Sequence, residues 1–443
     1  TVIPGFFLGM KPDMMLTMMF LGIILFPEKK SVLLLGLVFA ELGAALPRTG
    51  GVIRYPVYTH GPLVAYLFSF ITLVAYSTLI AIEVEAARQY AAAWWPALTQ
   101  AGSTSPTVLG WLVQFGMLLV FFLLNYGGIK VFAKFNTIIT VFKFIVPGLT
   151  IILLLTQLKV ANFTIAGFAP FGATGIESAI STGGVIFAYL GLTPIISVAS
   201  EAKKPQRTIP FALIISVALS MLVYVLLQIV FIGAIPTDML SGGWVTINEK
   251  FSLPFKDIAA VLGLGWLGAL IISDAIISPG GTGNIYMNTT PRIVYGWARN
   301  KTLFKIFERI DEKTGIPRPS LWLTFLLALF WTLPFPSWDK LISVVSNALI
   351  LSYAVAPICA GALRRNGADL QRPFFLKGMN ILSPLSFIIA SLIVYWSGWN
   401  TISWLFGLQI VMFIVYLLFK KAVPTDNVSF HQQLKSSGLY SIV

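Results

Sequence analysis

The sequence predicts an all-α integral membrane protein with about twelve transmembrane helices. Of its 443 residues, 57% are hydrophobic and only 11% are charged, and its mean hydropathy is +0.85. Most of the chain therefore cannot form a soluble core beneath a charged surface. Apolar stretches of roughly 20 residues, the length that a helix needs to cross a bilayer, recur along the whole chain. We expect them to belong to the folded protein rather than to a cleaved targeting segment.

Twelve stretches have the length and the helical or uniformly apolar pattern of a membrane span. They lie near residues 14–26, 31–47, 61–87, 107–126, 136–158, 181–200, 208–235, 257–283, 319–335, 341–363, 380–398 and 402–420. The first is weak, because its apolar run is short and follows Lys11, Pro12 and Asp13. Either that helix is broken or its first part is missing from this sequence.

Basic residues are distributed unevenly between the two sides of the predicted membrane. An even number of spans puts both termini on one side, and twenty-one of the thirty Lys and Arg residues fall on that side, against seven opposite. Because cytoplasmic loops collect Lys and Arg, both termini are predicted to be cytoplasmic. The net charge of +13 then reflects topology and gives no reason to expect nucleic acid as a partner.

The stretch VIFAYLGLTPIISVASEAKKPQRTIP, residues 185–210, begins as a membrane span yet contains Gly191 and Pro194. Helix breakers in mid-membrane free backbone N–H and C=O groups, which lipid cannot satisfy. If the helix unwinds between Tyr189 and Pro194, two half-helices direct their ends at one place, where a bound zwitterion can satisfy these groups. A simple proline kink without a ligand explains the same residues, and the sequence leaves both readings open.

Four motifs resemble the amino acid, polyamine and organocation (APC) transporter superfamily and follow its order. FAYLG followed by ASEAKKPQRTIP is similar to its sixth helix, and FAELGAALPRTGGVIRYP (39–56) to its second helix and the next loop. SDAIISPGGTGNIYMNTTPRIVYGWARN (273–300) resembles the eighth helix, and KIFERIDEKTGIPRPSLWL the loop before the ninth. Within the superfamily, IEVEAARQY (82–90) together with SPGGTG is most similar to bacterial aspartate and proton symporters.

The resemblance implies a LeuT-like fold, in which two five-helix repeats of inverted orientation, with helices one and six broken, precede two further helices. Residues 1–160 would form the first repeat with an atypical or truncated first helix, 161–363 the second repeat, 364–422 the last two helices, and 423–443 a cytoplasmic tail. The implied function is secondary active transport of an amino acid, coupled to protons, by alternating access in a prokaryotic plasma membrane. The alternatives are an exchanger of amino acids or polyamines and a transport-inactive sensor or partner subunit.

The resemblance places the amino acid substrate at the break in the sixth helix, on Ala188, Tyr189, Leu190, Gly191 and Thr193. The chain departs from the family pattern at two places. Residues 1–38 lack the Gly-rich GxG run with which the family's first helix cradles the substrate carboxylate. Leu192 and Thr193 follow Gly191 where the family often has an acidic or aromatic residue, so the substrate side chain cannot be inferred from this position.

Placing an ionisable residue inside a membrane span costs roughly 2.5–3.5 kcal/mol on insertion scales. We therefore expect each such residue to have a structural partner or a functional role. Lys143, in the fifth span, resembles the lysine that occupies the ion site of sodium-coupled relatives in some proton-coupled ones; pairing with backbone carbonyls is the alternative. Asp274 precedes SPGGTG, where we expect local unwinding, and is either a proton carrier or the salt-bridge partner of Lys143. Ser273 and Ser278 are expected to take part in gating with Lys143.

Glu83 and Glu85 stand two residues apart and therefore face different directions on a helix. Either is a candidate for proton coupling, but Glu85 has Arg88 three residues further on, a spacing that commonly gives a structural or gate ion pair. Near the cytoplasmic end of the sixth span, a charged cluster is expected to be solvated, with gating as the alternative. Its members are Glu201, Lys203, Lys204 and Arg207.

Catalytic and metal-binding motifs are missing from the sequence. His60 and His431 are the two histidines, and the patterns GxSxG, HExxH and the phosphate-cradling Walker pattern do not occur. We therefore expect neither an enzyme nor a metal site, and the proton is the expected coupling ion without any further cofactor. Cys359 is the single cysteine, so an internal disulfide is excluded.

Overall fold

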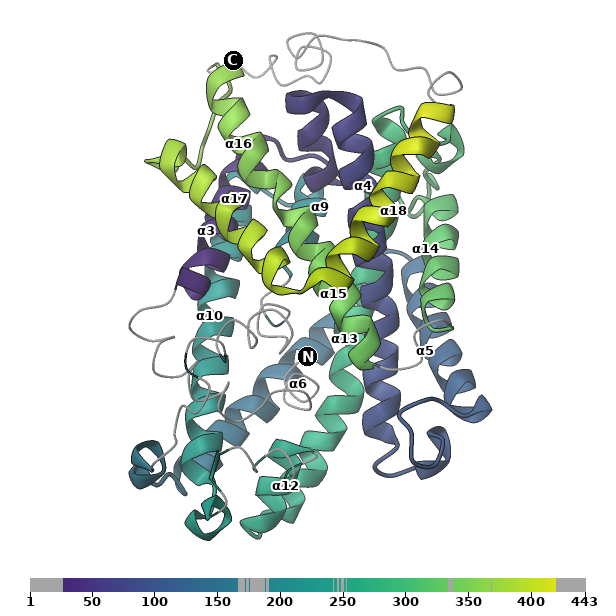
Figure 1. Ribbon diagram of the computed structural model, residues 1–443. Helices are drawn as coiled ribbons and strands as arrows, with labels where there is room; N and C mark the ends of the chain where they lie inside the picture. Colours follow the sequence, from purple (N-terminus) through teal and green to yellow (C-terminus); the bar gives the residue numbers. More distant parts are fainter. Residues whose placement is uncertain are drawn as a thin grey trace.

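Figure 1 shows the computed structural model. It describes residues 27–165, 172, 175, 188, 191–241, 243, 244, 247, 251, 253–333, 338–367 and 369–419. The predicted first span, residues 181–190 of the predicted span 181–200 except for Ala188, and the predicted tail 423–443 lie outside these residues. Apart from an isolated β-bridge between Thr99 and Pro106, the described residues form helices, turns and loops. The all-α prediction is confirmed for this part of the chain.

The α-helices occur where the membrane spans were predicted, with some changes of boundary. They are α3 (Pro27–Ala45), α4 (Gly51–Ala91), α5 (Val108–Tyr126), α6 (Ile129–Leu155), α9 (Leu192–Ser197), α10 (Pro205–Ala234), α12 (Pro254–Val261), α13 (Gly265–Arg299), α14 (Arg318–Trp331), α15 (Trp338–Tyr353), α16 (Val355–Asn366), α17 (Met379–Trp396) and α18 (Trp399–Phe419).

Six stretches of the described chain are long and apolar enough to cross a membrane. They are Gly51–Ala91, Val108–Tyr126, Phe132–Leu155, Pro205–Ala234, Val345–Asn366 and Met379–Trp396. Shorter apolar helices cover Leu33–Ala45, Arg318–Trp331 and Ile402–Leu418. Helix α13 has 35 residues but is not among the six, because glycines and polar side chains such as Asp274 and Asn284 lower its hydropathy.

The helices divide into an inner and an outer set. In the most apolar stretch of α4, 72% of the residues are buried. In the corresponding stretches of α6, α10 and α17, only 28% of the residues are buried. Figure 1 shows α4 and α13 running through the bundle, with α10 on one side and α5 and α14 on the other. Since the outer helices expose apolar side chains, their outer faces suit contact with lipid.

Three boundaries differ from the sequence prediction. The predicted eighth span, 257–283, is divided: α12 ends at Val261, Gly263 has a positive φ of 75°, and α13 then continues to Arg299. The predicted span 341–363 is likewise divided between α15 and α16. Helix α4 begins at Gly51 rather than 61, because Gly61 (φ 83°) and the proline after it bend the helix instead of starting it.

The glycines of SPGGTG pack helices together and do not unwind α13. The helix continues through this segment, which corrects the expectation of local unwinding there. A Cβ atom at Gly283 would lie 2.6 Å from the ring of Phe121 on α5, and one at Gly281 would lie 2.7 Å from Ile139 on α6. These contacts are too close for any side chain, so the glycines allow α13 to approach both neighbours.

The inner helices α4 and α13 also meet through glycine where α4 begins. Gly50 has a positive φ of 72°, and a Cβ atom there would lie 2.8 Å from the carbonyl oxygen of Arg292 and 3.2 Å from the Cα of Gly296. Both the backbone conformation and the close approach therefore require glycine. The Gly50 N–H donates to the carbonyl of Ser197 at 3.0 Å, which ties α9 to the same place.

Candidate functional site

Helix α9 begins beside the predicted break in the sixth span. The chain is helical at Ala188 and again from Leu192, and Gly191 lies in a non-helical conformation just before α9; Tyr189 and Leu190 are outside the described residues. The Gly191 N–H donates to the Tyr353 hydroxyl at 3.0 Å, and the Thr193 hydroxyl lies 3.5 Å from the same oxygen. Tyr353 thus caps backbone donors that a helix start leaves without intrahelical partners.

Three buried tyrosines from three helices meet at this helix start: Tyr76 on α4, Tyr286 on α13 and Tyr353 on α15. The rings of Tyr76 and Tyr286 pack edge to face, with centroids 5.0 Å apart, and the Tyr76 hydroxyl lies 3.4 Å from that of Ser197. Tyr353 lies close to both. The Tyr286 hydroxyl has no hydrogen-bond partner within the described chain. Such hydroxyl groups can bind the carboxylate or ammonium of an amino acid.

Replacing Gly191 with leucine should weaken substrate binding about tenfold or more without unfolding the protein. A Cβ atom at Gly191 meets no atom within 4 Å, so a side chain can enter this space and obstruct a ligand that uses it. Binding of labelled amino acid to the purified variant measures the effect, where a tenfold change corresponds to ~1.4 kcal/mol. Gly116→Leu is the control, because a Cβ atom there is also unobstructed. Unchanged affinity of Gly191→Leu would assign the break to a simple kink.

Lys143 on α6 reaches toward α13. Its ammonium donates to the Thr282 hydroxyl at 3.0 Å, and a Cβ atom at Gly281 would lie 3.0 Å from the Lys143 nitrogen. Gly281 therefore provides the room for this side chain. This partner is a hydroxyl one turn beyond Ser278, on the helix where Ser273 and Ser278 were expected to act with Lys143.

Two carboxylates lie near the Lys143 ammonium. Glu83 on α4 and Asp274 on α13 are only 3% and 6% exposed, and both are close enough to interact electrostatically with Lys143. Asp274 accepts a hydrogen bond from Ser278 at 2.5 Å, which brings these two predicted residues together. In contrast, Ser273 is partly exposed and donates to the Ala269 carbonyl of its own helix at 2.9 Å. Lys143, Glu83 and Asp274 form the group that we call the charge cluster.

Glu85 belongs to a different network from Glu83. It accepts hydrogen bonds from Arg88 and Gln114, and Arg88 is fully buried. The Arg88 guanidinium also donates to the Thr99 hydroxyl and the Thr104 carbonyl, both at 2.7 Å. This arrangement ties the loop after α4 to α4 and α5. Glu85 thus occupies the position of a structural ion pair, away from the charge cluster.

The predicted cytoplasmic end of the site is closed by contacts between α9, α4 and α13. Glu201, just after α9, forms a two-pronged ion pair with Arg292 of α13, and one of its two hydrogen bonds measures 2.9 Å. The Arg292 guanidinium also donates to the Asn288 carbonyl at 2.6 Å. Thr49 and Ser200 are joined by a hydrogen bond of 2.6 Å. Glu201 therefore joins neighbouring elements and is not merely part of a solvated cluster.

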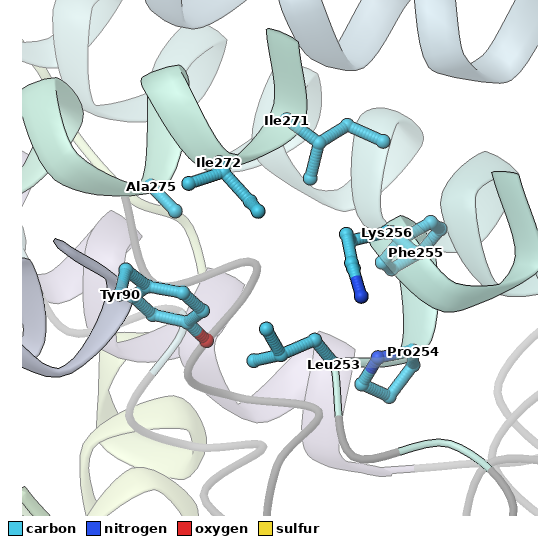
Figure 2. A pocket seen from close by; sticks show the side chains of 8 residues that line it. All are labelled: Tyr90, Leu253, Pro254, Phe255, Lys256, Ile271, Ile272 and Ala275. Carbon is cyan, nitrogen blue, oxygen red and sulfur yellow. The ribbon is translucent and has the colours of Figure 1, made fainter. Parts of the chain in front are cut away.

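A small cavity lies between the end of α4, α12 and the start of α13. Figure 2 shows its lining, which is mostly apolar except for Tyr90 and Lys256. It has room for about one water molecule. It is thus too small to hold an amino acid, and it is separate from the helix start at Gly191. Among the described residues, no group of three or more His, Cys, Asp and Glu could hold a metal ion.

The sequence did not single out several residues of this site. Tyr76, Tyr286 and Tyr353 come from helices distant in the chain, and a tyrosine within or beside an apolar span looks like ordinary core. Thr282 lies inside SPGGTG, where the glycines drew attention to the backbone instead. A polar residue one or two turns from Asp274 on the same helix was the available signal for Thr282.

Charged and polar side chains enclosed by apolar helices, beside the non-helical Gly191, are typical of a membrane transporter for a small polar solute. The amino acid permease family model matches residues 5–432. The aspartate-proton symporter of Bacillus subtilis (strain 168) is 63% identical over 406 residues, which are 92% of this chain and 78% of that protein. The glutamate/serine transporter AimA of the same organism is 37% identical, over 83% of this chain and 69% of its own length. The mouse b(0,+)-type amino acid transporter 1 is 25% identical, with coverages of 81% and 72%.

The chain belongs to the amino acid permease family. It is therefore an integral membrane transporter of amino acids, as the motifs predicted, and not an enzyme. Its bacterial relatives and its apolar helices agree with a place in the plasma membrane.

Proposed function

We propose that this protein carries aspartate together with protons across the plasma membrane by alternating access. The observation that carries the proposal is its 63% identity, over 92% of the chain, to a protein named for aspartate-proton symport. The charge cluster supports it, because buried groups of both signs contributed by three helices suit a proton-coupled rearrangement.

In this proposal the substrate binds where α9 begins. Gly191 and Thr193 supply a backbone N–H and a hydroxyl, and Ala188, Tyr189 and Leu190 would complete the wall on the other half-helix. The Tyr353 hydroxyl now bonded to Gly191 would yield its place to a substrate carboxylate. The helix dipole at this end favours negative charge.

Proton coupling is assigned to Lys143, Asp274 and Glu83. A charged Lys143 donates a hydrogen bond to Thr282 and holds α6 against α13. A neutral Lys143 is no longer attracted to the charges of the two nearby carboxylates, so the contact between the helices weakens. Ser278 holds the Asp274 carboxylate and thus takes part in the same gating step. Ser273 and Glu85 are less suited to these roles, since one bonds its own helix and the other is paired with Arg88.

The proposed architecture has twelve spans, with five-helix repeats over residues 1–160 and 161–363 in inverted orientation. Residues 364–422 form two further helices, and 423–443 a tail. The support is the family membership and the order of the described helices. In this arrangement α3 to α6 belong to the first repeat and α9 to α16 to the second.

Transport assays with the purified protein in liposomes test this function. Labelled aspartate should accumulate when the outside is more acidic, and a proton-conducting ionophore should abolish the accumulation. An exchanger would require amino acid or polyamine inside the liposomes and would ignore the pH gradient. A transport-inactive subunit would take up nothing under either condition, and each of these two results would contradict the proposal.

The orientation is tested by labelling, and both termini should be cytoplasmic. A cysteine placed after Lys421 should react with an impermeant reagent only after the cells are permeabilised, because the basic loops keep that end inside. Ser103→Cys, in the exposed loop before α5, should react in intact cells. Labelling of the tail from outside would reverse the orientation.

A further inference from the structure

The loop between α13 and α14 exposes large apolar side chains. Phe304, Ile306 and Ile310 are 66%, 50% and 45% exposed. They lie outside both helices, since α13 ends at Arg299 and α14 begins at Arg318. Contact with lipid acyl chains along a membrane span explains why α5 and α10 expose apolar side chains. It does not explain the exposure of these three side chains, because they lie in a loop between two helices.

This loop is held firmly against the rest of the protein. Thr302 and Ile316 are 4% and 3% exposed, and the Phe307 side chain packs against the main hydrophobic core. The Ser320 hydroxyl of α14 donates to the Phe307 carbonyl at 3.1 Å. The three apolar side chains thus project outward from an anchored backbone, and no other part of the described chain buries them.

Cations alternate with these apolar side chains. Lys305, Arg309 and Lys313 are exposed, and within the described chain none of them forms an ion pair. Two neighbouring acidic side chains form ion pairs with other arginines. Glu308 lies 3.7 Å from Arg299, and Asp311 lies 3.2 Å from Arg318.

A neighbouring hydroxyl group stabilises the charged form of the Asp311 carboxylate. It accepts a hydrogen bond of 2.7 Å from the Thr314 hydroxyl, and that bond lowers the pKa of Asp311. Glu312 remains as an exposed acid. The loop surface therefore carries unneutralised positive charge among exposed apolar groups.

We propose that residues 304–313 form a docking surface for anionic phospholipids of the membrane in which the protein sits. Phe304, Ile306 and Ile310 enter the boundary between headgroups and acyl chains, and Lys305, Arg309 and Lys313 contact the lipid phosphates. Apolar side chains interleaved with cations are the chemistry that binds to a negatively charged bilayer surface. The loop joins the ends of two helices of the bundle, so it lies at the level where a bilayer surface is available.

A single-cysteine label tests the insertion. Cys359 is the single cysteine of the chain, so Cys359→Ala combined with Phe304→Cys accepts one polarity-sensitive fluorophore. We expect blue-shifted emission, quenched by brominated lipid, in vesicles of phosphatidylcholine mixed with phosphatidylglycerol, and a smaller shift in phosphatidylcholine alone. The control Glu312→Cys should report water in both. A water-like signal from position 304 in both vesicles would overturn the proposal, and equal insertion in both would overturn the choice of an anionic lipid.

Charge removal tests the headgroup contact. The variant Lys305→Gln, Arg309→Gln, Lys313→Gln, carrying the same label, should need about tenfold more phosphatidylglycerol in mixed micelles to reach half of its emission shift. The matched variant Lys203→Gln, Lys204→Gln, Arg207→Gln removes three exposed cations elsewhere and should behave as the parent does. If both variants respond alike, the surface has no lipid preference of its own.

Discussion

Replacing Lys143 with alanine is expected to abolish concentrative uptake while leaving a folded protein that still binds amino acid. Lys143 is the cation of the charge cluster, and its ammonium bonds Thr282 across the contact between α6 and α13. Alanine leaves the neighbouring Gly281 without a clash, so the helices can stay packed. The proposed binding groups at Gly191 and Tyr353 also remain intact.

The size of the effect follows from the driving force. A gradient of one pH unit supplies about 1.4 kcal/mol per proton, which supports about tenfold accumulation if one proton accompanies each substrate. Uptake by wild-type liposomes should approach this ratio, whereas the Lys143→Ala variant should only equilibrate substrate. Lys134→Ala removes an exposed cation of the same helix and should leave accumulation unchanged. If Lys143→Ala accumulates substrate with the wild-type pH dependence, Lys143 is structural, and Asp274 or Glu83 becomes the better candidate.

Replacing Arg88 with methionine is expected to destabilise the protein by about 3–5 kcal/mol, the cost of leaving a buried charge without its partner. Arg88 is fully buried and paired with Glu85, and it also holds the loop at Thr99 and Thr104. Methionine keeps much of the volume but removes every one of these hydrogen bonds. Thermal unfolding of the detergent-solubilised protein measures the loss.

A double variant separates structure from coupling at this site. Glu85→Gln together with Arg88→Met removes both charges, so it should lose less stability than Arg88→Met alone and retain pH-driven uptake. Arg299→Met is the control, because its contact with Glu308 is exposed at the surface and worth at most about 1 kcal/mol. A folded double variant without pH-driven uptake would move Glu85 into the coupling machinery.

Only part of the charge cluster could be predicted from the positions of its residues along the chain. Lys143, Asp274 and Glu83 attracted attention because a charge within an apolar span is costly, and that cost is visible in the sequence itself. The i, i+3 spacing already indicated that Glu85 pairs with Arg88, and the structure shows this pair. That Glu83 lies near Lys143 was not visible from spacing, because it depends on the rotation of α4 against its neighbours.

The sequence by itself determined that this is an all-α membrane protein of the amino acid permease type, together with the order of its helices. Hydropathy, span length and motifs are properties of the chain in one dimension, so they survive without knowledge of packing. The tertiary structure alone decided that Lys143 bonds Thr282, that the SPGGTG glycines bring helices together, and that Tyr76, Tyr286 and Tyr353 meet beside α9. These contacts depend on the depth and rotation at which distant helices pack, and close packing through glycine constrains both.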